Sequence, residues 1–391
     1  MLTFDLTQLS LPVLTILGMT IAVTFHMTRS PVFSLIAGIV KTSLFALYFG
    51  IFFDGTFTFL DDWTYLDGGQ ELLKQRVGLS NLYDHLELVF SAGGGGHILY
   101  YLYNVYAFRL FGEGYFAPVA CNVLLTLVIA TLGARLAEKE FGFSRNWKKL
   151  FFVFLLFHPD ILAWSNVMNG KDTLVLLSHV ILLTAVSLFI RGQIGKALIL
   201  AFPTVLSLFF LRFYVPLLFS AALLVAIGFR AGGYGRIWLL LCVASLFGGS
   251  LVFLGMANLA QAVDLVQEKF VNPAYGLVRF LFTPIPFNTE EAYAFLDISA
   301  ALHWLMMPCA GYGLLYIYRR RTLYSRAFLY YLAAFVFLYA VFGELQGPRH
   351  RVQLDYAWAL LQFIGLRQLI QNGIARKDQS PISGKEQVVN V

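Results

Sequence analysis

Long apolar runs recur along the whole chain and constrain its fold more than any other feature. Hydrophobic residues make up 59% of the sequence, charged residues make up 13%, and the mean hydropathy is +0.71. A run of about 20 apolar residues is long enough for a helix to cross a bilayer. The runs do not alternate between apolar and polar residues, as the strands of a membrane barrel would. The sequence therefore predicts an all-α, polytopic membrane protein.

About 11 of these runs are predicted to be transmembrane helices. Basic residues fall in the connections after every second predicted span, for example at Arg145 and at Arg320. Cytoplasmic loops of membrane proteins are enriched in Lys and Arg, so these connections are assigned to the cytoplasm. The predicted spans cover residues 11–27, 32–53, 115–135, 150–166, 173–190, 197–211, 214–229, 237–256, 301–318, 327–342 and 353–370.

This assignment places the N-terminus outside and the C-terminus in the cytoplasm. Most of the 28 Lys and Arg then lie on the cytoplasmic side, whereas most of the 22 Asp and Glu do not. The net charge of +6 follows from this topology and is not interpreted as a sign of nucleic-acid binding. Residues 371–391 are expected to form a short cytoplasmic tail.

Residues 54–114 are predicted to be one large external segment. Within it, residues 97–111 are apolar but short, and they contain Asn104, Arg109 and several tyrosines. We expect this stretch to form a helix in the membrane interface. The alternative, a twelfth span, would place Asp61 and Asp62 in the cytoplasm. Two further external loops are predicted at residues 257–300, which several prolines interrupt, and at 343–352.

Polar residues that are costly to place near lipid gather on the predicted external side. Such groups usually face a cavity, pair with one another or take part in function. The sequence therefore marks them as candidate site residues. They are Asp61, Asp62, His158, Asp160, Lys171, Asp172, Arg212, Arg279, Glu344, Arg349, His350 and Arg351.

Several of these residues also have a purely structural explanation. Asp62 and Asp172 each precede an apolar stretch and are suitable N-caps. Asp160 would do no more than pair with His158 or with Lys171. The side chain of Arg212 has a long apolar stem that would let it reach the headgroups. The cluster from Arg349 to Arg351 would also attract lipid phosphates without specificity.

The chemistry available to these groups is limited. Arginine binds phosphate oxygens with a planar fork of N–H donors. A carboxylate can accept the proton of an attacking hydroxyl group. The sequence lacks a serine nucleophile elbow, an H-E-x-x-H zinc motif and a phosphate-binding Walker loop. A phosphate-bearing lipid is therefore the predicted substrate class.

The first half of the chain contains short motifs of a known family. An acidic pair and a tyrosine follow a predicted span in Asp61-Asp62-Trp63-Thr64-Tyr65. A further segment ends in Leu110-Phe111-Gly112, a later span ends near Phe141-Gly142, and Pro159 and Asp172 follow. Residues 32–190 thereby resemble the transmembrane module of the type C glycosyltransferases, in particular the protein mannosyltransferase and lipid A aminoarabinose transferase group.

The resemblance implies a sugar transferase that uses a polyprenyl-phosphate donor on the outer face of the bacterial cytoplasmic membrane. Asp61 would be the general base, and Asp62 and Asp172 would orient the acceptor or hold a divalent metal. Tyr65 would contact the substrate together with several charged residues. These are His158, Asp160, Lys171, Arg212, Arg279, Glu344 and the Arg349–Arg351 group. The acceptor is expected to be a glycan, a lipid or a protein, in contact with membrane lipids.

The chain departs from this pattern in ways that leave other functions open. Residues 1–31 add a span before the module, and Asp62 replaces a common glutamate. Residues 191–370 are expected to form a C-terminal transmembrane bundle, in which RFLFTPIPF and GPRHR resemble bacterial exopolysaccharide assembly proteins. A polysaccharide polymerase or ligase that uses polyprenyl-diphosphate glycans is one alternative. A transporter or lipid-glycan flippase is the other.

Overall fold

The fold was described from a computed structural model that covers most of the chain. The described residues are 4–55, 61–92, 97–212, 214–228, 271–289, 291–343 and 347–378. Within these ranges the regular elements are all helices, and no strand is present. The predicted all-α class is therefore confirmed for the described part of the chain.

Six helical segments in the described ranges are long and apolar enough to cross a membrane. A seventh is obtained if two consecutive helices, bent by 41°, are counted as one span. The protein is thus a polytopic helical membrane protein by length and composition. The six are α1 (Leu6–Thr28), α2 with η1 (Pro31–Phe52), α6 (Phe116–Phe141), α9 (Asp172–Ile190), α15 with the end of η4 (Tyr293–Arg320) and α16 (Leu323–Val341).

The predicted number of about 11 spans is not reproduced by these segments. Two predicted spans correspond to the shorter helices α10 (Ile194–Phe209) and α11 (Tyr214–Gly228). The last corresponds to α18 (Asp355–Asp378). The prediction for residues 237–256 lies outside the described residues.

The bent span contains a proline at its break. Helix α7 (Arg145–Leu156) ends before His158, and α8 (Pro159–Val167) begins directly after it. Proline lacks a backbone N–H and clashes with the preceding turn, so it is favoured where a new helix starts. The break places His158 and Asp160 inside the protein, where both side chains are buried.

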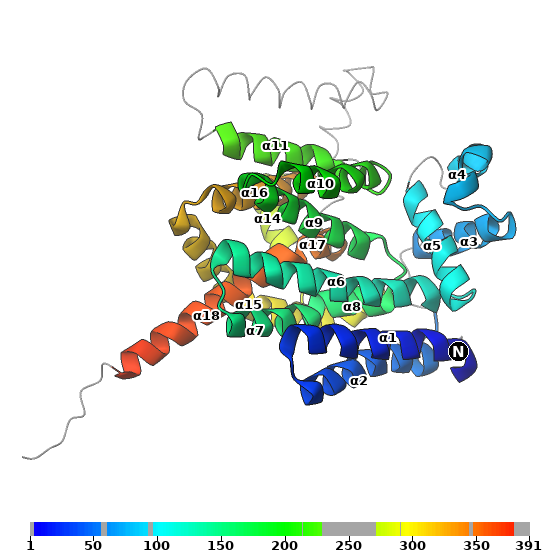
Figure 1. Cartoon of the computed structure of the whole chain (residues 1–391), viewed down its shortest axis with the longest axis horizontal. Coiled ribbons are helices and arrows are strands. Elements are labelled where there is room, and N and C mark those ends of the chain that lie inside the picture. Colours follow the sequence, from blue (N-terminus) through cyan, green and yellow to red (C-terminus); the bar gives the residue numbers. More distant parts are fainter. Residues whose placement is uncertain are drawn as a thin grey trace, which may run out of the picture.

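The large external segment forms a group of helices at one end of the molecule. It contains α3 (Asp61–Lys74), the short η2 (Leu79–Asn81) and η3 (Tyr83–His85), α4 (Leu86–Ala92) and α5 (Ile98–Phe111). In Figure 1 α3, α4 and α5 lie together beyond the ends of α1 and α6, at the end where the N-terminus is marked. Helix α5 packs against α3 and α6 and is not among the helices able to cross a membrane.

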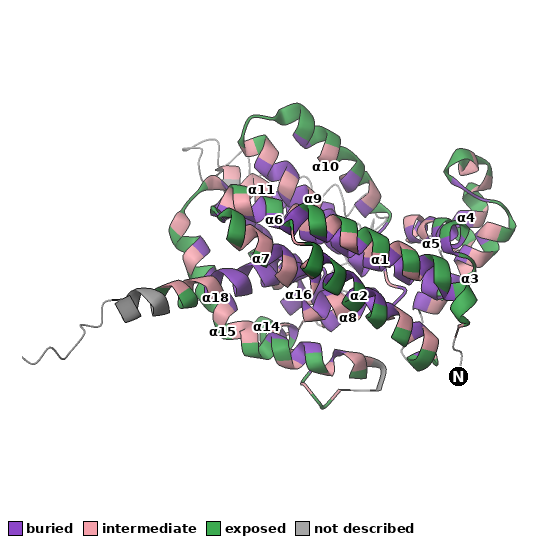
Figure 2. Ribbon diagram, turned by 60° about the horizontal axis from the view of Figure 1, so that its bottom comes forward, coloured by how far each residue is buried: buried purple, intermediate pink, exposed green. Residues whose placement is uncertain are grey.

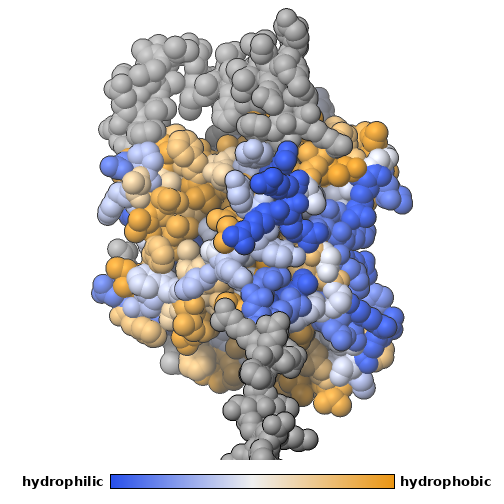
Figure 3. Space-filling model, turned by 90° about the vertical axis from the view of Figure 1, so that its left-hand side faces the viewer, coloured by the Kyte–Doolittle hydropathy of each residue, from blue (hydrophilic) through white to orange (hydrophobic). Residues whose placement is uncertain are grey.

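Basic and acidic side chains meet at the opposite end. Lys148 at the start of α7 pairs with Glu138 of α6 at 2.8 Å. Arg191, which follows α9, pairs with Glu140 at 2.9 Å. Arg320 donates a hydrogen bond to the carbonyl oxygen of Phe141. Figure 3 shows hydrophilic residues gathered on this end of the molecule, with apolar surface on either side.

The sides of the molecule expose many large apolar residues. Figure 2 shows exposed residues along α10 and on the outer faces of α1 and α2. Ile199 and Phe202 of α10 are 73% and 71% exposed, and Val32 of α2 is 68% exposed. Water would disfavour so large an apolar surface. Contact with lipid chains explains it, in agreement with the apolar runs of the sequence.

Helices α15 (Asp297–Arg320) and α18 cross with their backbones in close contact. A Cβ atom added to Gly313 would overlap the carbonyl group of Leu361. One added to Gly365 would overlap the carbonyl group of Cys309. Small residues allow such an approach between membrane helices. The absence of a side chain at these two glycines thereby allows α15 and α18 to pack closely.

The C-terminal half also contains two short helices, α14 and α17. Helix α14 (Pro273–Phe282) ends before Pro284 and packs against α16. Its end confirms that prolines interrupt residues 279–288. Helix α17 (Pro348–Val352) carries the Arg349–Arg351 group and contacts α8, α9 and α14. The η4 segment (Glu291–Leu296) leads into α15.

Candidate functional site

Arg349 joins two aspartates that are far apart in the sequence. Its Nη1 atom lies 2.8 Å from Oδ2 of Asp61, and its Nε atom lies 2.9 Å from Oδ2 of Asp172. Asp61 is in the first turn of α3, and Asp172 is in the first turn of α9. The partial positive charge of a helix N-terminus favours a carboxylate in both places. We call Asp61, Asp172, Arg212 and Arg349 the outer cluster.

Arg212 and Gln353 complete the surroundings of Asp172. Arg212 Nη2 lies 3.1 Å from Asp172 Oδ1, and Gln353 Nε2 donates to the same oxygen at 2.7 Å. The Asp172 side chain is 3% exposed, whereas that of Asp61 is 49% exposed. Asp172 is therefore buried and bonded to three side chains, whereas the carboxylate of Asp61 is accessible to solvent.

A neutral histidine contacts the outer cluster through Arg212. His350 Nε2 lies 3.3 Å from Arg212 Nη1. Burial, together with Arg212, lowers the pKa of His350 to about 3. A neutral imidazole can accept a hydrogen bond from Arg212. Burial alone would lower the pKa of Arg349, but Asp172 and Asp61 raise it overall. Arg349 is therefore fully charged.

Lys171 lies beside the outer cluster and contacts Tyr65. Its Nζ atom is 2.6 Å from the Tyr65 hydroxyl oxygen and 5.2 Å from the centre of the Tyr65 ring. Burial, with Arg212 and Arg349 nearby, lowers the pKa of Lys171 to about 6. Its amine is thus largely neutral at pH 7. Of the two partners predicted for Asp160, Lys171 bonds Tyr65 instead, and Asp160 lies near His303 and Arg351.

The side chain of Asp62, next to Asp61 in the sequence, is bonded to Tyr115. Tyr115 donates a hydrogen bond to Asp62 Oδ2 at 2.7 Å, and Asn169 Nδ2 donates to the Asp62 carbonyl oxygen at 3.1 Å. Asp62 is only 2% exposed. These contacts fix the start of α3 against the loop between α8 and α9. The acidic pair therefore has two different environments.

Buried amide groups hold that loop in place. Asn169 Oδ1 accepts from the Tyr100 hydroxyl at 2.9 Å, and Asn169 Nδ2 donates to Asn104 Oδ1 at 3.0 Å. Asn122 Nδ2 donates to the carbonyl oxygen of Gly170 at 3.2 Å. Asn122 Oδ1 also accepts a hydrogen bond from the Tyr103 hydroxyl of α5 at 2.9 Å. Because α5 supplies Tyr100 and Asn104, the external helices position Lys171 and Asp172.

The aspartates and Arg349 line one small cavity. Part of its lining comes from the end of α8 and from the loop that follows α8. The cavity brings together three predicted catalytic residues, although Asp62 contributes a side chain already bonded to Tyr115. It is lined by Asp61, Asp62, Trp164, Met168, Asn169, Gly170, Asp172 and Arg349.

Other predicted site residues lie elsewhere. Arg351 points away from the outer cluster, and its Nη1 atom donates to the carbonyl oxygen of Thr283 at 2.6 Å. Arg279 is exposed on α14 and has no ion pair among the described residues. Glu344 lies outside the described residues. Asp61 and Asp172 are bridged by Arg349, so these two and Asp62 form no group of metal ligands in the described part.

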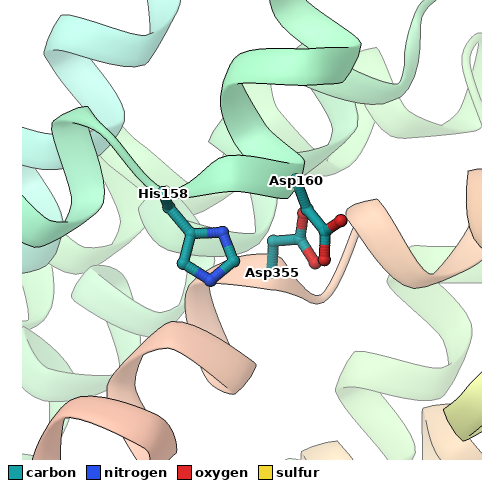
Figure 4. A group of neighbouring side chains, drawn as sticks. All are labelled: His158, Asp160 and Asp355. Atoms are coloured by element: carbon teal, nitrogen blue, oxygen red, sulfur yellow. The ribbon is translucent and has the colours of Figure 1, made fainter. Parts of the chain in front are cut away.

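His158 and Asp160 belong to a second, deeper group. Asp160 Oδ2 lies 3.6 Å from Arg351 Nη2 and 3.7 Å from His303 Nδ1. Ligand atoms of His158, Asp160 and Asp355 lie within 4.8 Å of one another. Figure 4 shows the two carboxylates side by side, with the His158 ring next to them. We call His158, Asp160, His303 and Asp355 the inner cluster.

The sequence analysis missed several residues of these groups. Gln353 and Asp355 lie in a predicted span, and His303 lies in another, where each was treated as part of an apolar run. An ionisable residue inside a span is itself a signal of function. Tyr115 and Asn169 gave no signal of their own. Comparison with protein-family models, with curated proteins and with solved structures found no match to this chain.

Proposed function

We propose that the protein is a membrane glycosyltransferase that moves a sugar from a polyprenyl-phosphate donor to an external acceptor. The observation that carries this proposal is the outer cluster, in which two arginines and two aspartates converge at the end of the helices. Arginines would bind the donor phosphate, and an open carboxylate would accept a proton. The acceptor is a glycan, a lipid or a protein.

The differing exposure of the two aspartates supports a division of roles. The Nε atom of Arg349 binds the buried Asp172, whereas its Nη1 atom binds the half-exposed Asp61. A phosphate that replaced Asp61 on Nη1 would keep Arg349 in place and free the Asp61 carboxylate. Asp61 would then take the proton of the acceptor hydroxyl. That oxygen would attack the anomeric carbon, and the bond from this carbon to the phosphate oxygen would break.

An apolar groove next to the cluster suits the donor's lipid chain. It is lined mainly by apolar residues of α2, η1, α8, η4 and α15, including Leu44, Leu162 and Leu302. Its lining also includes Val167, which is next in sequence to the cavity residue Met168. A polyprenyl chain in the groove would place its phosphate near Arg349. This arrangement supports a lipid-linked donor.

The proposed setting is the bacterial cytoplasmic membrane, with about 11 spans, the N-terminus outside and the C-terminus in the cytoplasm. Residues 54–114 would then lie wholly outside. Cysteines introduced at Ser80 and Glu113 should both react with an impermeant thiol reagent added from outside. Protection of Glu113→Cys while Ser80→Cys is labelled would instead show that α5 crosses the membrane.

The function is tested by transfer of labelled sugar from polyprenyl phosphate in liposomes. Asp61→Asn should lower transfer by about 10²–10⁴-fold, because a general base contributes this much, while donor binding persists. Asp67→Asn is the matched control, since Asp67 is exposed on the same helix. Arg349→Ala should weaken donor binding by roughly 1.5–3 kcal/mol.

The same assay separates the alternatives. Full activity in Asp61→Asn with an inactive Asp62→Asn would exchange the roles of the acidic pair. Full activity in both variants would contradict the transferase mechanism and favour transport of the lipid-linked glycan. Transfer only from polyprenyl-diphosphate glycans would favour a polymerase or ligase.

A further inference from the structure

Three separate parts of the chain converge on the inner cluster. His158 lies at the break between α7 and α8, Asp160 is in the first turn of α8, and Asp355 is in the first turn of α18. His303 reaches the same point from α15. All four side chains are at most 3% exposed. A buried polar group needs a partner, because water cannot reach it.

The carboxylates of this cluster are poorly compensated by the surrounding residues. Neither oxygen of Asp355 has a hydrogen-bond partner in the described part of the chain. Arg351 is the nearby cation, and its Nη2 atom lies 3.6 Å from Asp160. One guanidinium faces two carboxylates, so the group requires another positive charge. Asp172 differs from Asp355 in that three side chains donate hydrogen bonds to its carboxylate.

The two histidines are oriented as metal ligands are. His303 Nε2 donates to the carbonyl oxygen of Leu281 at 3.1 Å, so in the neutral ring Nδ1 carries a lone pair. His158 Nε2 is likewise bonded to Gln362 Oε1 at 3.2 Å. Neither Nδ1 atom has a hydrogen-bond partner among the described residues. Metal-bound histidines commonly donate the other ring N–H to an oxygen in this way.

We propose that His158, Asp160 and Asp355 form a buried site for one divalent transition-metal ion, with His303 Nδ1 beside it at 3.7 Å from Asp160 Oδ2. Imidazole nitrogen and carboxylate oxygen together suit ions such as Zn²⁺ and Mn²⁺. The ion would join α8 and α18 at the break in the bent span. Its position differs from the outer cluster, where Arg349 already bridges the aspartates.

The test begins with the metal content of the purified full-length protein, measured by mass spectrometry of the elements. About one equivalent of a divalent transition metal is expected per chain. After removal by a chelator, Mn²⁺ is titrated back and followed by electron paramagnetic resonance. Asp355→Asn and His158→Gln should each weaken Mn²⁺ binding by at least about tenfold. Asp61→Asn, in the outer cluster, should bind Mn²⁺ as the original protein does.

A second measurement needs no variant of the inner cluster. Co²⁺ added to the chelator-treated protein should produce visible absorption bands of a nitrogen- and oxygen-ligated ion, and Zn²⁺ should remove them. Absence of both the bands and bound Mn²⁺ would overturn the proposal and leave a proton as the compensating charge. Loss of the ion in Asp61→Asn, with retention in Asp355→Asn, would also overturn it by placing the ion in the outer cluster.

Discussion

The outer and inner clusters contain similar residues but differ in how their charges are compensated. In the outer cluster Asp172 contacts Arg212, Arg349 and Gln353 within 3.1 Å. In the inner cluster Asp355 has no hydrogen bond to any described residue. A buried ion is stable only when it is paired and bonded. The outer cluster is therefore complete without a ligand, whereas the inner cluster requires one.

The difference also concerns access. Asp61 gives the outer cluster a side chain that is 49% exposed, and the apolar groove lies next to it. The members of the inner cluster are all buried. An exchangeable contact between Asp61 and Arg349 suits a site that binds and releases substrate. A closed cluster suits a permanently held ion.

The largest expected effect comes from breaking the outer cluster. Arg349→Met should destabilise the protein by about 3–5 kcal/mol, because Asp172 would stay buried with one of its two cations removed. Thermal unfolding in detergent measures this change. Arg279→Met is the control, since Arg279 is exposed on α14. Equal stability of the two variants would show that the Asp172 pairing contributes nothing.

A smaller effect is expected from Lys171, whose pKa is about 6 in the folded protein, compared with its ordinary value of 10.5. Between these values the unfolded chain binds more protons, so stability should rise with pH in this window. The rise should be about 1.4 kcal/mol from pH 7 to pH 8. In Lys171→Met this contribution should be lost.

The control for this measurement is Lys74→Met, because the Lys74 side chain is 68% exposed. It should keep the pH dependence of the original protein. The same slope in Lys171→Met and in the original protein would mean that Lys171 titrates near its ordinary pKa. A third full positive charge would then lie beside the two arginines of the outer cluster.

The smallest effect is expected from Asp355→Asn in the metal-free protein. Asp355 makes no hydrogen bond within the described ranges, so its replacement by Asn breaks no bond and should not lower the unfolding free energy by more than about 1 kcal/mol. Asp172→Asn should instead cost about 3–5 kcal/mol, because two arginines lose their partner. Unfolding of both variants after treatment with a chelator measures the difference. Similar costs would mean that the inner cluster is balanced by its own residues.

Long apolar runs predicted the helical membrane class. The rule that charges near lipid must pair or face a cavity predicted that Asp61, Asp172, Arg212 and the Arg349–Arg351 group gather on the external side. The sequence did not predict that Arg349 and Arg351 point to different clusters. Side-chain direction on a short helix such as α17 depends on packing against α8, α9 and α14, which no local pattern contains.

The inner cluster shows the same limit. The spacing of residues along the chain forms no metal-binding motif, because the residues of the inner cluster come from α8, α15 and α18. Asp355 and His303 each interrupt an apolar stretch, and that interruption was the available signal. The described part of the chain supports fewer than the predicted 11 spans for a different reason. Helices such as α10 are apolar but shorter than a membrane crossing requires.

The close crossing of α15 and α18 has a consequence for the inner cluster. His303 precedes Cys309, and Asp355 precedes Leu361, by fewer than two helical turns each. The glycines at this crossing therefore set how far apart the two side chains stand. A methyl group added at Gly313 or Gly365 would force the backbones to separate. Two residues without a side chain thus tune the geometry of the proposed metal site from outside it, because they set the spacing of the helices that carry His303 and Asp355.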